Sequence, residues 1–251
     1  MIRHVKGLVL KSVQYSESDK LLTVLSEEGI LFFKARGIRS ITSKNAAGCA
    51  AFVYSEFELE QRGDKYYLRR ATPLYSTVRA GADIVTLALA SYFAELAEDT
   101  ARDAETGKAV LRLLMNALYL LTKDDRPRDQ IKSIFEMRVL VANGLMPQLS
   151  ACQVCGKATE ELPSVFFRLT EGDLVCPECV SSFDTALMRV SRDLITLCIH
   201  SVEAPEERAY AIKVPDALLK EFSRFTERFL LNQLERKYAT LDFYHQVKNL
   251  T

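Results

Sequence analysis

The chain has 251 residues, with 33 lysines and arginines against 33 aspartates and glutamates. This length is enough for two domains, and the balanced charge gives no overall sign of a polyanionic partner. The apolar runs are too short to cross a bilayer, and no charged and apolar signal segment opens the chain. We therefore expect a cytoplasmic protein with no membrane partner.

The charge is unevenly distributed along the chain. Residues 1–80 hold thirteen basic and eight acidic side chains, a net charge of +5, and the remainder carries −5. Because the first third is basic while the chain as a whole is neutral, we predict that this part of the chain binds a polyanion.

The first 80 residues predict a small barrel. Turn signals separate five runs rich in β-branched and aromatic residues, at 5–13, 20–25, 30–36, 51–59 and 65–70. Five short strands with no long helix fit a closed barrel of the OB type, and an SH3-like barrel is the nearest competitor. The polar stretch from Gly37 to Gly48 should form an exposed loop.

After Pro73 the pattern changes to helices. Apolar residues recur at helical spacing in five segments, at 82–98, 106–122, from Pro127 to Asn143, 184–200 and 215–237. We therefore predict an α+β chain, with an OB-fold domain at residues 1–80. A helical domain at 81–251 would carry a cysteine-rich module at about 148–182.

Two Cys-x-x-Cys pairs, twenty residues apart, stand inside that module. They are Cys152, Cys155, Cys176 and Cys179. This spacing is typical of a four-thiolate zinc ribbon, in which a closed tetrahedral site stabilises the fold and leaves no position for substrate. Two disulfides, or a dithiol redox motif, are the alternatives, and a reducing compartment favours the metal. We therefore expect one structural zinc ion.

The sequence offers no catalytic constellation. It has no glycine-rich phosphate loop ending in Lys-Ser or Lys-Thr, and no Gly-x-Ser-x-Gly. Its three histidines, His4, His200 and His245, are scattered. We expect a binding protein rather than an enzyme. A nuclease stays as an alternative, although no acidic metal-binding cluster supports it.

A basic segment at the end of the third strand is the richest candidate for binding. The candidate DNA-binding residues are Lys34, Arg36, Gly37, Arg39 and Lys44. Lys34 and Arg36 share one face of a strand, and such a row suits the phosphates of a single strand. Aromatic residues for base stacking would come from Tyr54, Tyr66 and Tyr67, with Phe57 facing the core. A solvated rim on an ordinary barrel is the alternative interpretation.

Three segments resemble the RecO family of bacterial recombination mediators. Gly7-Leu8-Val9-Leu10 with Tyr15-Ser-Glu-Ser-Asp-Lys20 resembles its first strand and turn, and Ala35-Arg-Gly-Ile-Arg39 resembles its basic signature. Gly144-Leu-Met-Pro-Gln-Leu149 resembles the entry to its zinc module. The similarity covers nearly the whole chain in order. Ser40-Ile41 departs from the family pattern.

The resemblance implies an N-terminal OB fold and a helical domain with a zinc ribbon. Such a protein would bind single- and double-stranded DNA without sequence specificity and anneal complementary strands without ATP, as a nucleoid-associated protein. With RecR, it would help to load the recombinase onto DNA coated with single-stranded-DNA-binding protein. The competing hypothesis is a protein–protein adaptor whose basic barrel meets an acidic partner.

Overall fold

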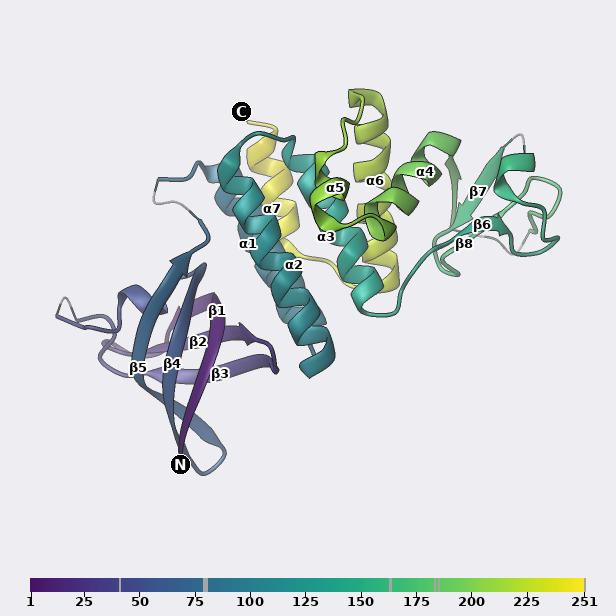
Figure 1. The fold of residues 1–251 in the computed structure, drawn as a ribbon. Helices are drawn as coiled ribbons and strands as arrows, with labels where there is room; N and C mark the ends of the chain where they lie inside the picture. Colours follow the sequence, from purple (N-terminus) through teal and green to yellow (C-terminus); the bar gives the residue numbers. More distant parts are fainter. Residues whose placement is uncertain (41, 79–80, 163, 183, 185, 251) are drawn as a thin grey trace. The chain divides into compact units, whose positions relative to one another are not determined.

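The computed structural model describes residues 1–40, 42–78, 81–162, 164–182, 184 and 186–250 (Figure 1). The chain divides into two compact units, residues 1–125 with 238–251, and residues 126–237. No helix among the described residues is long and apolar enough to span a membrane.

Five strands of the first unit close into a barrel. They are β1 (Ile2–Gln14), β2 (Lys20–Ser26), β3 (Gly29–Ala35), β4 (Val53–Arg62) and β5 (Lys65–Ser76). Their order around the barrel is β1-β2-β3-β5-β4, and β3 and β5 pair in parallel through Phe33 with Tyr66 and Lys34 with Tyr67. This closed five-stranded arrangement confirms the predicted OB fold and excludes the SH3-like alternative.

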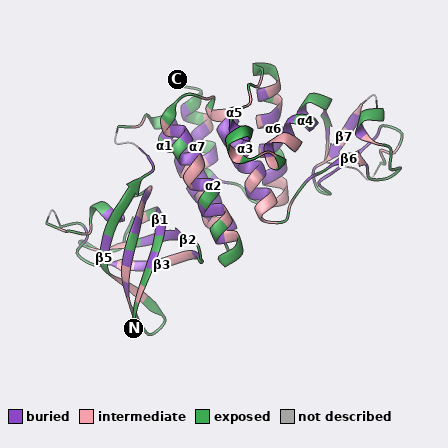
Figure 2. Ribbon diagram, in the orientation of Figure 1, coloured by how far each residue is buried: buried purple, intermediate pink, exposed green. Residues whose placement is uncertain are grey.

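Alternation along the strands builds the barrel core. In β3, Leu31, Phe33 and Ala35 pack inward, while Phe32 and Lys34 lie on the outer face. Phe57 of β4 is fully buried against Phe33, as the sequence predicts, with ring centroids 5.1 Å apart. Most of β5, by contrast, is exposed (Figure 2). The barrel therefore has an apolar interior and a largely accessible β5 side.

Among its described residues, the first unit also has three α-helices, namely α1 (Ile84–Thr100), α2 (Ala104–Lys123) and α7 (Ala239–Lys248). Asp83 caps α1 by accepting hydrogen bonds from the first-turn amides, and Asp103 does the same for α2 within a capping box. The predictions of helices at 82–98 and 106–122 therefore hold. Sequence analysis did not predict α7, which places His245 in a helix.

Glycine permits α2 to lie directly on the turn between β2 and β3. A Cβ atom added at Gly107 would come within 2.5 Å of the Gly29 nitrogen. Gly29 itself has a φ of 102°, a conformation that favours glycine. Two glycines therefore bring the helix backbone into contact with the barrel backbone.

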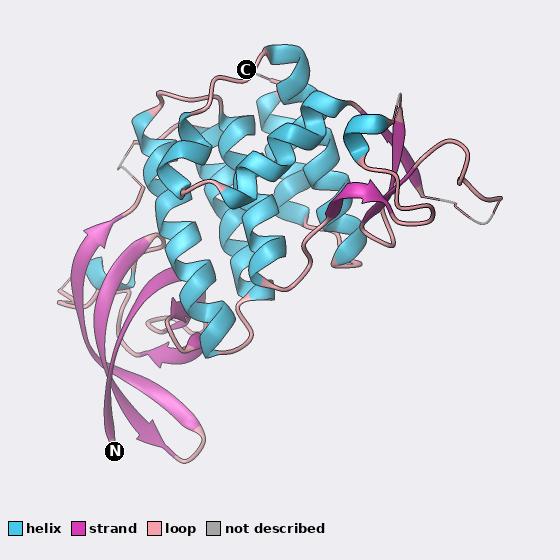
Figure 3. Cartoon of the chain, turned by 45° about the vertical axis from the view of Figure 1, so that its right-hand side comes forward, coloured by secondary structure: helices cyan, strands magenta, loops and turns pink. Residues whose placement is uncertain are grey.

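The second unit combines a helical layer with a small sheet (Figure 3). The helices are α3 (Arg128–Ala142), α4 (Arg192–Glu203), α5 (Glu206–Ala211) and α6 (Asp216–Gln233). The sheet has the order β6-β8-β7-β9, from β6 (Gln148–Cys152), β7 (Val165–Arg168), β8 (Asp173–Val175) and β9 (Leu187–Val190). Two short 3-10 helices, η1 (Ala47–Cys49) and η2 (Thr159–Glu161), lie in loops of the first and second units respectively.

The helix predicted at 184–200 is wrong at its start. Leu187–Val190 is a strand paired with β7, and the helix begins at Arg192 after Ser191, whose hydroxyl accepts from the Leu194 amide. Met188 and Val190 are buried and Arg189 between them is exposed, which is the period-two pattern of a strand. A short apolar run of this kind does not distinguish a strand from a helix, and the helix prediction therefore began too early. Residue 185 lies outside the described residues.

Aromatic packing and a buried ion cluster hold the second unit together. Phe167 of the sheet contacts Phe225 and Phe229 of α6, with ring centroids 4.9 and 5.0 Å apart. The apolar stripe of the last predicted helix is therefore core. An ion cluster also joins helices α3 and α6. The Lys132 Nζ atom on α3 lies 2.8 Å from both Glu136 Oε1 on the same helix and Glu227 Oε2 on α6.

Candidate metal centre and nucleic-acid interface

Four cysteine sulfurs converge at one end of the small sheet. Cys152 ends β6 and Cys176 follows β8, and these two strands pair in parallel. Cys155 and Cys179 each stand three residues further along a tight turn. All four Sγ atoms lie within 4.8 Å of one another. The sheet therefore brings together the residues that the sequence singled out.

The sulfur geometry fits a tetrahedral metal site. Zinc–sulfur bonds of about 2.3 Å place neighbouring sulfurs about 3.8 Å apart, and the Sγ atoms of Cys155 and Cys176 are 3.9 Å apart. Gly156 closes the first turn with a φ of 74°. The Lys157 ammonium, on the first turn, lies 2.9 Å from the Glu178 carboxylate on the second.

Backbone amides favour a thiolate at Cys152. Burial raises the pKa of this thiol, but amide groups of Cys155, Cys176 and Val154 together outweigh burial and lower the pKa to about 6. The Cys176 amide, for example, donates to Cys152 Sγ over 3.4 Å. Cys152 therefore offers one of the deprotonated ligands that metal binding needs. By contrast, a hydrogen bond with Cys176 raises the pKa of Cys179 to about 12.

The basic segment of the barrel is held by Asp19. Its carboxylate accepts a 3.0 Å hydrogen bond from the Gly37 amide and lies 2.9 Å from Lys34 Nζ. These two contacts, the amide first, lower the pKa of Asp19 to about 2. The Lys34 ammonium also lies 4.2 Å from the ring centre of Tyr15. Lys34 is therefore partly neutralised within the barrel itself.

Arg36 and Arg39 leave more of their charge accessible. The exposed Arg36 guanidinium lies 4.8 Å from the ring centre of Tyr67, and stacking of this kind leaves its N–H groups available. Arg39 donates one hydrogen bond of 2.9 Å to the Glu17 carbonyl and is also exposed. Gly37, with a φ of 61°, turns the chain between them. Ile41, in the segment departing from the family pattern, lies outside the described residues.

Lys44 belongs to a separate basic hollow, which sequence analysis missed. The hollow has a volume of about 670 Å³ and is lined by Lys44, Asn45, Glu58, Arg69, Arg70, Ala71, Thr72 and Pro73. A bulge in β5 opposite Glu58 and Leu59 leaves both Arg69 and Arg70 exposed. Two adjacent arginines were visible in the sequence, but the bulge that exposes both was not.

The predicted stacking residues are dispersed. Tyr67 lies on the outer face between Arg36 and Arg62, whereas Tyr66 packs against the barrel core. Tyr54 lines a different hollow with the side chains of α2, and burial raises its pKa. Of these residues, Tyr67 alone accompanies the basic segment.

Comparison with known proteins identifies the family. A model described as "Recombination protein O N terminal" matches residues 1–77, and one described as "Recombination protein O C terminal" matches residues 81–242. The chain belongs to the RecO family.

Relatives in the RecO family cover almost the full length of the chain. A DNA repair protein RecO from Acetivibrio thermocellus is 27% identical over 238 residues, which is 94% of each chain. One from Anaeromyxobacter is 29% identical over 245 residues, covering 96% of this chain and 94% of its own. One from Heliobacterium modesticaldum is 33% identical over 156 residues, or 62% of this chain and 56% of its own. The family is one of DNA repair proteins.

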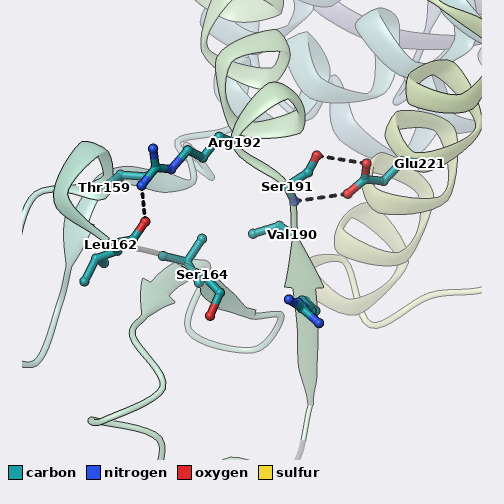
Figure 4. A pocket seen from close by; sticks show the side chains of 9 residues that line it. Thr159, Leu162, Ser164, Val190, Ser191, Arg192 and Glu221 are labelled. Atoms are coloured by element: carbon teal, nitrogen blue, oxygen red, sulfur yellow. Dashed lines mark hydrogen bonds between the residues drawn. The ribbon is translucent and has the colours of Figure 1, made fainter.

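The second unit of this RecO-family chain contains a further hollow of about 320 Å³ (Figure 4). The Ser191 amide and hydroxyl donate to the Glu221 carboxylate over 3.1 and 2.9 Å, and Arg192 donates to the Leu162 carbonyl. These groups satisfy one another. The hollow lies where η2, β9 and α6 meet.

Proposed function

We propose that this RecO-family chain is a DNA-repair and recombination mediator that acts by binding and not by covalent catalysis. It binds single- and double-stranded DNA without sequence specificity through the barrel, and it anneals complementary strands without ATP. With RecR it helps to load the recombinase onto DNA coated with single-stranded-DNA-binding protein. The pair of exposed arginines, Arg36 and Arg39, on the barrel of a DNA-repair family member carries this proposal.

The chemistry of the basic segment supports sequence-independent binding. Guanidinium groups contact phosphates, which are identical at every nucleotide, and each neutralised phosphate releases counterions. Lys34, Arg36, Gly37, Arg39 and Lys44 are the proposed contacts. Among them, Arg36 and Arg39 dominate, because Asp19 already neutralises part of the Lys34 charge.

Annealing follows from the same charges. Two complementary strands repel each other through their phosphates, and cations on the barrel screen this repulsion. Base pairing then supplies the free energy, so no nucleotide hydrolysis is needed.

We further propose that Cys152, Cys155, Cys176 and Cys179 hold one zinc ion. Four thiolates are a soft donor set that suits zinc, and they saturate a tetrahedral ion. The ion would hold the two turns of the small sheet together and take no part in a reaction. Their converging sulfurs support this assignment.

The test is annealing of two complementary oligonucleotides, followed by fluorescence without ATP across a salt series. The full zinc-loaded chain should accelerate annealing at low salt and lose the effect as salt rises. Arg36→Glu with Arg39→Glu should remove most of the acceleration.

Lys220→Glu with Arg224→Glu is the matched control. It reverses two exposed cations on α6 and changes net charge by the same amount. An equal loss of annealing acceleration in both double variants would show that overall charge, and not the position of the arginines, causes the effect. No acceleration by the folded wild-type chain, together with binding to acidic peptides but not DNA, would favour the adaptor.

A further inference from the structure

An apolar strip crosses the outer face of the barrel beside the basic segment. Cross-strand partners place Val13 of β1 next to Leu21 of β2, and Leu21 next to Lys34 of β3. Phe32 lies on the same face of β3, two residues before Lys34. The exposed fractions are 46% for Val13, 39% for Leu21 and 55% for Phe32.

Phe32 is not needed by the barrel core. Its neighbour Phe33 points inward and is 1% exposed, whereas no ring or cation contact involves the Phe32 ring within the described part of the chain. A large exposed aromatic next to exposed aliphatic residues marks an interaction surface. The strip is therefore an accessible apolar surface beside the basic segment.

Cations border the strip on the β5 side. Tyr67 of β5 is the strand partner of Lys34, and the Arg36 guanidinium lies over the Tyr67 ring. Lys65, at the exposed start of β5, precedes Tyr66, the partner of Phe33. An occupant that matches both features has a flat apolar group and a regularly spaced negative charge. An unpaired nucleotide has both, whereas a duplex hides its base faces within the stack.

We propose that Phe32, supported by Leu21, stacks on an unpaired base while Arg36 and Lys65 hold the flanking phosphates. This rests on the proposed DNA binding and adds the residue that makes the barrel favour single strands over duplex. The arginines serve both forms of DNA, and Phe32 serves only the single strand.

The absence of tryptophan from the chain permits a direct test. Phe32→Trp introduces the sole indole, whose emission falls when a base stacks on it. Phe243→Trp on α7, where Phe243 is 45% exposed, is the matched control.

We expect an oligo(dT) strand to quench the indole emission of the Phe32→Trp chain, and an abasic oligonucleotide or a duplex of equal length to leave it unchanged at saturation. The Phe243→Trp chain should keep its emission with all three. Binding of oligo(dT) without quenching at position 32, or equal quenching by the abasic strand, overturns the proposal.

Affinity measurements separate this inference from the proposed function. Phe32→Ala should weaken binding of oligo(dT) about tenfold and leave duplex binding unchanged, while Phe32→Tyr should retain both. Arg36→Glu with Arg39→Glu should weaken both.

If the arginine double variant binds neither single-stranded nor duplex DNA and Phe32→Ala binds both normally, the stacking role is wrong and the proposed function stands. If the arginine variant binds DNA normally, the barrel assignment itself fails. Unchanged DNA binding with loss of RecR binding in Phe32→Ala would make the strip a protein interface instead.

Discussion

Replacing Lys132 with methionine should severely destabilise the second unit. The Lys132 and Glu136 side chains are fully buried, while the Glu227 side chain is 23% exposed. Without the ammonium, Glu227 can turn toward water, but Glu136 stays buried with the 2.7 Å hydrogen bond from the Thr226 hydroxyl. Removing one partner of such a buried pair costs about 3–5 kcal/mol, a large share of a domain's stability of about 5–15 kcal/mol.

The loss should depend on pH. Burial raises the pKa of Glu136, and Lys132 opposes this rise, so the pKa rises further in Lys132→Met. A group whose pKa is raised in the folded state contributes stability below its unfolded pKa, and this contribution is lost as pH rises through the folded value. The variant should therefore be closer to wild type at about pH 6 than at about pH 8.5.

Urea denaturation of the zinc-loaded chain, followed by circular dichroism at both pH values, measures this difference. Adding Glu136→Gln removes the stranded charge and should recover part of the stability at the higher pH. A single variant with the wild-type midpoint at both pH values, or a double variant no more stable than the single one, would refute the reasoning.

Three further changes test other contacts. Cys176→Ser should release zinc and lower the melting temperature of the second unit, and metal loss with an unaltered melting curve would contradict the proposed structural role. Asp19→Asn should loosen the turn at Gly37 and shift its amide resonance. In the wild-type chain, the stabilising contribution of Asp19 should persist above about pH 4 and disappear as pH falls through about 2, which a carboxyl NMR titration reports. Gly107→Ala should destabilise the first unit by about 1–3 kcal/mol, since its methyl group meets the Gly29 backbone, and a wild-type urea midpoint would show that α2 shifts freely.

The sequence predicts the barrel and the cysteine cluster because both depend on local patterns. Period-two alternation and turn residues define the strands, and the Cys-x-x-Cys pairs define the two turns. The boundary predicted after residue 80 stays a prediction, and limited proteolysis followed by mass spectrometry of the fragments tests it.

The features that sequence analysis missed depend on tertiary structure. Helix α7 is only ten residues long, and it is stabilised where Tyr238 donates to Asp99 on α1 over 2.8 Å. Phe32 stands in the run Ile30–Phe33, in which all four residues are apolar. Because apolar and polar residues do not alternate there, the sequence does not show which side chains face the core. The β5 bulge likewise depends on pairing with β4.

The discontinuous first unit has a consequence for synthesis of the chain on the ribosome. Residues 238–251 belong with the barrel, yet 126–237 precede them in the sequence. Tyr92 of α1 packs against the ring of Tyr238, so this face of α1 lacks its partner until all of the second unit has been translated. The cysteine turns emerge earlier, so the proposed metal site can form in the nascent second unit before the first unit is complete.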